Sequence, residues 1–284
     1  MPTTQSGGID IHYRVAGDGP ETILLVNGVG DDLDAWPNQI PDLLAAGLRV
    51  VTFDNRGVGR SGQPAGLYTS REMAADAKAV VDVLELGPFH IAGVSMGGCI
   101  ALEYALAYAA DLRSAIFANT YARPDPFTYA AFEAWGLIAQ AAGTSVLMRQ
   151  MAPWIFSPSF YETQPANVAA LIAEMERSPQ PPAAFAAQIG ALLSHDCLER
   201  LDEIRTKSLV LVADDDIIIR PALSRRLFDG LPDAEWAVVP GGHGAFWENP
   251  GPWNRTVIDF VARESAARSH PIDPETIHQE EGNP

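Results

Sequence analysis

The chain has 284 residues, 47% of them hydrophobic and 19% charged, so it can bury a sizeable core. Its formal net charge of −17 disfavours nucleic acids and anionic membranes as partners, because a negative field repels phosphate groups. The two cysteines, Cys99 and Cys197, form no CxxC pair or Cys/His cluster, so no disulfide framework or metal site is predicted. The start lacks the features of a signal peptide and no apolar run could span a bilayer, which predicts a cytoplasmic protein.

Short apolar runs alternate with helical patterns along most of the chain. An alternating run at 10–17 predicts an antiparallel edge strand, and apolar runs predict buried strands at 22–27, 49–53, 89–94, 113–119, 208–213 and 235–240. Helices are predicted at 70–86, with Ser70 as N-cap, and at 97–110, 221–229 and 252–266. This order predicts an α/β fold with a mainly parallel sheet covered on both faces.

The alternation stops between about Tyr121 and Leu193. That stretch contains helical patterns but no convincing strand, and sheet signals return at Ser208. We therefore predict a core formed by residues 1–120 and 196–266, a helical cap inserted at 121–195, and a polar C-terminal tail at 267–284.

The segment HIAGVSMGGCIALEY (90–104) places Ser95 in a G-x-S-x-G pattern between a strand and a helix. A sharp turn there would lift the hydroxyl above the carboxyl edge of the sheet. It would also leave the Met96 N–H at a helix N-terminus, where it can donate to an oxyanion. The pattern alone is weak, because a glycine-rich turn with an incidental serine explains it equally well.

A nucleophilic serine needs a base, and the base needs an acid that fixes its tautomer. His243, in VVPGGHGAFWENP, follows the last predicted strand and is the best candidate base, while His195 is the main rival outside the sheet. Asp216, in the run DDDIIIRP after strand 208–213, is the favoured acid. Its neighbours Asp214 and Asp215 are expected to face solvent or to cap the next segment.

A second oxyanion donor is predicted in LLVNGVGDD (24–32), near the backbone N–H of Val29. Inward-pointing carboxylates would oppose a developing negative charge. We therefore expect Asp31 and Asp32 to point outward or to be hydrogen-bonded within the loop.

Together these segments resemble the α/β-hydrolase family over about residues 8–120 and 196–263. FDNRGVGRSG (53–62), HDCLERLDEIRTKSLVLVADDD and GGHGAFWENP are similar to family loops, and serine, aspartate and histidine follow in the family's order. The resemblance implies a mostly parallel eight-stranded sheet with helices on both faces and a helical cap. It also implies a cofactor-free and metal-free triad of Ser95, Asp216 and His243. The usual His-Gly of the oxyanion loop is replaced here by Asn27-Gly28.

Within the family, the chain resembles the small esterases and lactonases, a group that includes 3-oxoadipate enol-lactonase. This resemblance predicts hydrolysis of a small-molecule ester or lactone through an acyl-enzyme on Ser95. Carbon–carbon bond hydrolysis, perhydrolysis or acyl transfer on the same scaffold is an alternative, and a non-catalytic ligand receptor is another. The oligomeric state stays open, a homo-oligomer included.

Aromatic side chains near the expected site are candidate pocket walls, because ligand sites are mostly apolar. Trp135 and Trp154 come from the cap, and Phe246 and Trp247 follow His243. Arg123 and Arg149 are either surface residues or partners of a substrate carboxylate.

Overall fold

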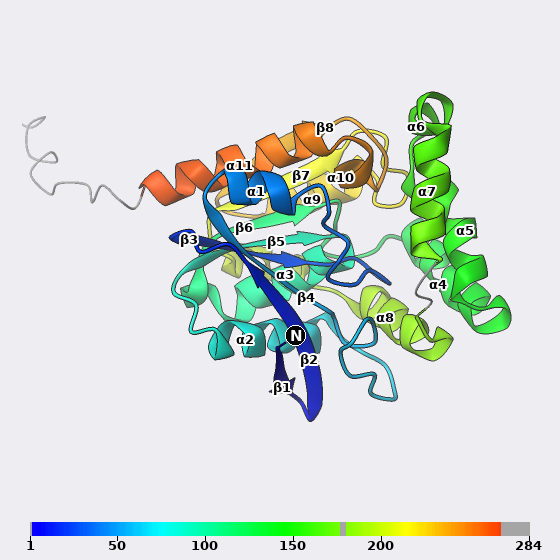
Figure 1. The fold of residues 1–284 in the computed structure, drawn as a ribbon, viewed down its shortest axis with the longest axis horizontal. Helices are drawn as coiled ribbons and strands as arrows, with labels where there is room; N and C mark the ends of the chain where they lie inside the picture. Colours follow the sequence, from blue (N-terminus) through cyan, green and yellow to red (C-terminus); the bar gives the residue numbers. More distant parts are fainter. Residues whose placement is uncertain (1, 177–179, 268–284) are drawn as a thin grey trace, which may run out of the picture.

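The computed structural model describes residues 2–176 and 180–267. Its centre is an eight-stranded sheet with the order β1-β2-β4-β3-β5-β6-β7-β8 (Figure 1). β1 and β2 pair antiparallel at one edge, β2 is antiparallel to β4, and all other pairs are parallel. The mostly parallel sheet is therefore confirmed. The strands are β1 Thr3–Ser6, β2 Ile9–Ala16, β3 Glu21–Val26, β4 Leu48–Phe53, β5 Phe89–Val94, β6 Leu112–Ala118, β7 Ser208–Ala213 and β8 Ala234–Val239.

Successive residues of the inner strands point to opposite faces of the sheet, and each face has its own apolar core. In β3, Leu24 and Val26 join one core, while Ile23 and Leu25 join the other. The first core is covered by α2, α3 and α9, and the second by α1 and α11. Figure 1 shows α2 on one side of the sheet and α1 and α11 on the other. These helices span α1 Ile40–Ala45, α2 Ser70–Val83, α3 Met96–Ala107, α9 Pro221–Gly230 and α11 Pro250–Ala267.

The described residues between β6 and β7 form five α-helices, in the stretch where no strand is predicted. Four of them begin with proline, which has no N–H to lose at the first helical position. In Figure 1, α4 to α7 stand together beyond one end of the sheet. Their bounds are α4 Pro126–Ala142, α5 Thr144–Ile155, α6 Pro158–Thr163, α7 Pro165–Met175 and α8 Pro182–Ser194.

The remaining elements are short. The 3-10 turns η1 Ala109–Asp111 and η2 Leu198–Glu203 precede β6 and β7, and α10 Ala245–Glu248 follows β8. The predicted C-terminal tail falls outside the described residues, except for Ala267 at the end of α11. None of the described helices is both long and apolar enough to cross a membrane.

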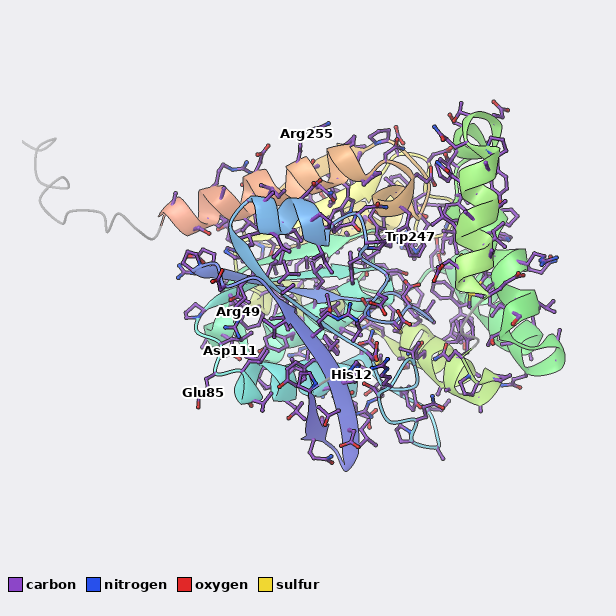
Figure 2. All side chains as sticks on the ribbon, viewed as in Figure 1. His12, Arg49, Glu85, Asp111, Trp247 and Arg255 are labelled. Atoms are coloured by element: carbon purple, nitrogen blue, oxygen red, sulfur yellow. The ribbon has the colours of Figure 1, made fainter. Side chains whose placement is uncertain are left out.

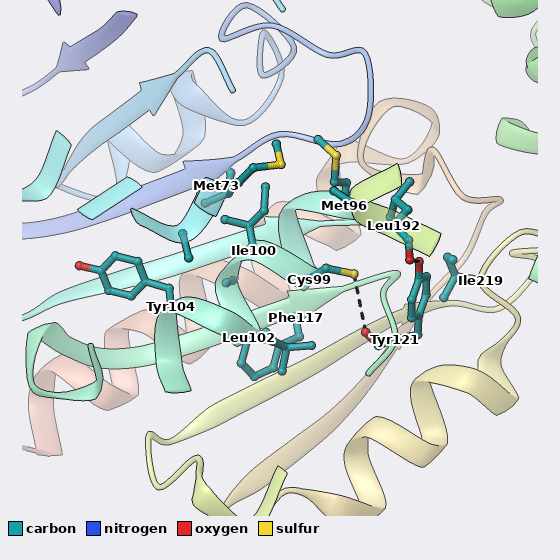
Figure 3. Packing of buried hydrophobic residues seen from close by; sticks show 14 of the residues in the cluster. Met73, Met96, Cys99, Ile100, Leu102, Tyr104, Phe117, Tyr121, Leu192 and Ile219 are labelled. Carbon is teal, nitrogen blue, oxygen red and sulfur yellow. Dashed lines mark hydrogen bonds between the residues drawn. The ribbon is translucent and has the colours of Figure 1, made fainter. Parts of the chain in front are cut away.

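Helix α3 is apolar on all sides and is buried from Met96 to Ala105. Figure 3 shows side chains of α3, among them Cys99 and Ile100, packed with Met73 and Phe117. The Cys99 thiol donates to the carbonyl oxygen of Tyr121, at 3.7 Å. This packing fixes the N-terminus of α3, where Ser95 lies.

Candidate active site

Ser95 occupies a strained turn between β5 and α3. Its backbone angles, φ 55° and ψ −117°, lie in a region that residues other than glycine rarely adopt. The backbone is packed tightly around it: a Cβ on Gly93 would lie 2.0 Å from the carbonyl oxygen of Gly97, and a Cβ on Gly97 would lie 2.0 Å from that of Val26. The glycines therefore let strand and helix approach closely enough to form this turn.

The close approach at Gly93 predicts a large loss of stability for Gly93→Ala. The added methyl group would overlap a backbone oxygen that cannot move alone, so we expect a loss of about 3 kcal/mol or more in the free energy of unfolding. Gly87→Ala is the matched control, because no atom lies within 4 Å of its added Cβ. Urea unfolding of both variants measures the difference, and equal stabilities would contradict the packing described here.

His243 and Asp216 are hydrogen-bonded to each other after β8 and β7. The distance from His243 Nδ1 to Asp216 Oδ2 is 2.7 Å. Asp216 is buried, and its Oδ1 accepts the backbone N–H groups of Ile218 at 2.9 Å and Ile219 at 2.8 Å. The carboxylate is thus held in place by its own loop, with one oxygen directed at the imidazole.

The two aspartates before Asp216 have other positions. Asp214 and Asp215 are exposed, and Asp214 Oδ1 accepts the N–H of Gly241 at 3.0 Å. Neither is hydrogen-bonded to His243 among the described residues.

Two further polar residues fix the His243 loop. The Asn119 side-chain amide donates to the carbonyl oxygen of His243 at 3.0 Å, and its oxygen accepts the N–H of Ala213 at 3.1 Å. Glu248 is buried and accepts from the N–H of Gly242 at 3.1 Å, and from the N–H and hydroxyl of Ser157 at 2.9 Å and 2.7 Å. Glu248 therefore ties the His243 loop to the segment between α5 and α6.

These contacts predict that Glu248→Ala destabilises the protein by about 2 to 4 kcal/mol, because it leaves buried donors of Gly242 and Ser157 without acceptors. Glu248→Gln keeps one acceptor oxygen in place, so its loss in the free energy of unfolding should be about half that of Glu248→Ala or less. Thermal and urea unfolding measure both, with the exposed Glu162→Gln as the control. A neutral effect of Glu248→Ala would show that these three hydrogen bonds do not stabilise the loop.

Ser95 and His243 line one small cavity between the sheet and the helices after β6. Its volume is about 40 Å³. Three of its wall residues are methionines, whose flexible side chains adapt to a ligand. The walls are mainly apolar and include Phe132, Trp135, Met148, Met151, Ile155, Met175, Ile218, Phe246 and Trp247.

The predicted pocket residues are thus not all at one place. Trp135, Phe246 and Trp247 line the cavity with Ser95. Figure 2 shows Trp247 at the end of the sheet that faces α7. Trp154 instead lines a separate cavity with Phe127 and packs against Trp135, with ring centroids 6.1 Å apart.

Val29 borders the cavity, and Met96 is the first residue of α3. In the described part of the chain, no hydrogen bond is formed by either backbone N–H. Both N–H groups therefore lack an acceptor among the described residues, and of the two residues only Val29 lines the cavity.

Asn27 stands where the family usually has histidine, and its side chain braces the same loop. Its amide donates to the carbonyl oxygen of Phe53 at 2.9 Å, and its oxygen accepts the indole N–H of Trp36. The neighbouring Asp54 accepts the N–H of Leu33 at 2.8 Å, which anchors the far end of the loop.

The expectation for Asp31 is wrong. Asp31 lines the cavity with Ser95, whereas Asp32 accepts the N–H of Asp34 at 2.9 Å, within the loop as expected. Burial, together with the neighbouring Asp32, raises the pKa of Asp31 to about 7, although His243 opposes the shift. The orientation of one carboxylate among loop residues depends on tertiary packing that the sequence does not display.

The rival histidine lies elsewhere. His195 is buried beside Glu103 and Cys197, and burial lowers its pKa to about 4. It does not line the cavity that holds Ser95. Arg123 and Arg149 are also outside that cavity: they pair with Asp196 at 2.7 Å and with Glu176 at 2.9 Å.

Among the described residues, no group of three histidine, cysteine, aspartate or glutamate side chains is arranged to hold a metal ion.

Comparisons with known proteins agree with this architecture. The family model described as alpha/beta hydrolase fold matches residues 21–250. A relative named "Putative carbamate hydrolase RutD", from Azorhizobium caulinodans, is 33% identical over 261 residues, which are 92% of this chain and 98% of the relative.

Two solved structures are similar over most of their length. A thermophilic esterase from Thermogutta terrifontis, with malate bound, has a TM-score of 0.83 at 26% identity, covering 92% of this chain and 97% of its own. The enol-lactonase from Burkholderia xenovorans LB400 has a TM-score of 0.84 at 25% identity, covering 92% of this chain and 100% of its own.

Proposed function

This chain belongs to the α/β-hydrolase family, and from that premise we propose that it is a serine hydrolase that cleaves a carboxylic ester or lactone. Ser95 attacks the carbonyl carbon while His243 takes the hydroxyl proton, and Asp216 orients the imidazole and stabilises its cation. The backbone N–H groups of Val29 and Met96 donate to the oxyanion. His243 then returns the proton to the leaving group. Water hydrolyses the acyl-enzyme, which releases the acid and restores Ser95.

One observation carries the proposal. The imidazole that accepts the Ser95 proton must present Nε2 as an acceptor, which requires the hydrogen on Nδ1. The 2.7 Å contact between Nδ1 and Asp216 Oδ2 favours this tautomer. The strained turn at Ser95 and the cavity shared by Ser95 and His243 supply the setting in which such a base is useful.

The acyl part of the substrate is proposed to be short and apolar. The cavity is small and its walls are aromatic, aliphatic and thioether side chains, with Asp31 as the one carboxylate. Phe246, Trp247 and Trp135 form part of the wall.

Labelling with an activated alkyl phosphonate tests the proposal. We expect one adduct per chain, located on Ser95 by peptide mass spectrometry, and loss of p-nitrophenyl acetate hydrolysis in proportion to labelling. Full hydrolysis by a completely labelled protein, or labelling only at other residues, would contradict it.

Carbamate cleavage is a second candidate, favoured by the name of the 33% identical relative. The same serine, base and oxyanion donors would act on a carbamate carbonyl and form a carbamoyl-enzyme. Rates for p-nitrophenyl acetate and for the p-nitrophenyl ester of a carbamic acid, compared under the same conditions, separate the two candidates.

A further inference from the structure

A second cavity continues the one that holds Ser95. Its volume is about 240 Å³, and the two cavities share Asp31, Met175 and Trp247 in their walls. It lies between the loop after β3 and α7, beside the cavity that holds Ser95.

The charged residues around this entrance cavity are all acidic. Among the residues that the structure describes, its walls include the carboxylates of Asp31, Asp32, Asp34 and Glu174, and no lysine, arginine or histidine. Asp34 is paired with Arg14 at 2.5 Å, and Arg14 does not line the cavity. A substrate carboxylate in this space would therefore meet four carboxylates, and no described cation in the wall would pair with it.

Asp31 lies at the junction of the two cavities, close to Ser95. The point where a Cβ on Gly28 would stand is 2.9 Å from Asp31 Oδ2 and 3.8 Å from Ser95 Cβ. Asp31 is half-buried, and within the described residues its carboxylate accepts no hydrogen bond.

The charge of Asp31 is thus only partly compensated by the described residues. Burial and Asp32 raise its pKa to about 7, His243 across the cavity opposes the shift, and Glu174 of α7 faces the entrance cavity with it. A positively charged group of a substrate would supply the missing compensation, and the aromatic side chain of Trp247 belongs to a residue that lines the same cavity.

We infer that the substrate carries an ammonium group on the alcohol side of the scissile bond, and that Asp31 is the specificity-determining residue that recognises it. This inference rests on the proposed hydrolase function. The apolar cavity beside Ser95 takes the acyl part, and the acidic entrance cavity takes the cation. The chemistry at the carbonyl carbon is unchanged.

Three acetate esters of similar length test the inference: acetylcholine, its neutral isostere 3,3-dimethylbutyl acetate, and the anion 4-acetoxybutanoate. They share the acyl group, so the chemistry of Ser95 cancels in their ratios. At pH 8 and low salt we expect kcat/KM for acetylcholine to exceed that for the neutral isostere by about five- to tenfold, with the anion slowest.

The ratio of the cationic to the neutral ester should also depend on pH. Since Asp31 becomes charged above a pKa of about 7, the ratio should rise from pH 6 to pH 8. His243 is the proposed base for both esters, so its contribution cancels in the ratio. In Asp31→Asn the ratio should fall severalfold and no longer rise, while the exposed Asp18→Asn should behave as the unmodified chain.

The outcomes separate the two proposals. Ser95-dependent cleavage with equal kcat/KM for acetylcholine and its isostere, or a ratio unaffected by Asp31→Asn, overturns the inference and leaves the hydrolase function standing. Failure to cleave any of the three esters or p-nitrophenyl acetate, with no phosphonate adduct on Ser95, overturns both.

Discussion

Replacing Ser95 by alanine should lower ester hydrolysis by about 10⁴-fold or more, to the level left by binding and oxyanion donors alone. The substitution removes only the hydroxyl group, whose oxygen is the proposed nucleophile. No described residue is hydrogen-bonded to it, and alanine meets the same backbone strain at a φ of 55° as serine does. The variant should therefore fold with nearly unchanged stability.

The measurement is kcat/KM for p-nitrophenyl acetate, together with the midpoint of thermal unfolding. Ser159→Ala is the matched control, because Ser159 is exposed at the start of α6. A well-folded Ser95→Ala variant that retains more than a small fraction of the hydrolysis would remove Ser95 from the mechanism.

Asp216→Asn is expected to have the next largest effect, a fall in kcat of about 10³- to 10⁴-fold with little change in KM. Asparagine can keep its oxygen on the amides of Ile218 and Ile219, so its NH₂ group then faces His243 Nδ1. That arrangement makes Nδ1 an acceptor and puts the hydrogen on Nε2, which can no longer take a proton from Ser95.

Asp214→Asn provides the control for charge and position. Asp214 precedes Asp216 by two residues, is exposed, and accepts an N–H group of the Gly241 backbone. Activity near that of the unmodified chain is expected for Asp214→Asn. If Asp216→Asn and Asp214→Asn had similar activities, the role proposed for Asp216 would be wrong.

The strands of the sheet were predictable wherever they are buried. The predicted run 208–213 coincides with β7, and 22–27 differs from β3 by one residue at each end, because apolar runs record burial on both faces. β1 was not predicted, since Thr3–Ser6 is short, polar and partly exposed; the only local signal is the Gly7-Gly8 turn that joins it to β2.

Helix ends depend on individual hydrogen bonds, which the sequence indicates less reliably. The N-cap of α2 is Thr69, and the predicted Ser70 is wrong. The Thr69 side chain accepts the N–H of Glu72, and the Glu72 carboxylate accepts the N–H of Thr69. The signal T-x-x-E at this capping box was present in the sequence.

In the candidate site, too, the features with a local sequence signal were predictable and those that depend on distant contacts were not. Ser95, Asp216 and His243 could be proposed because each follows a strand at the same edge of a parallel sheet, within segments that resemble those of a family. The contacts of Glu248 with Ser157 and of Asn119 with His243 could not, because each joins segments that are far apart in the sequence. Helical periodicity also does not separate Trp135, which lines the cavity, from Trp154, which does not.

A crystal structure of the chain inhibited by an alkyl phosphonate tests the central claim most directly. We expect phosphorus bonded to Ser95 Oγ, its oxygen accepting from the N–H groups of Val29 and Met96, and His243 Nε2 facing the Oγ. Phosphorus on another residue, or a phosphonyl oxygen turned away from both N–H groups, would contradict the account.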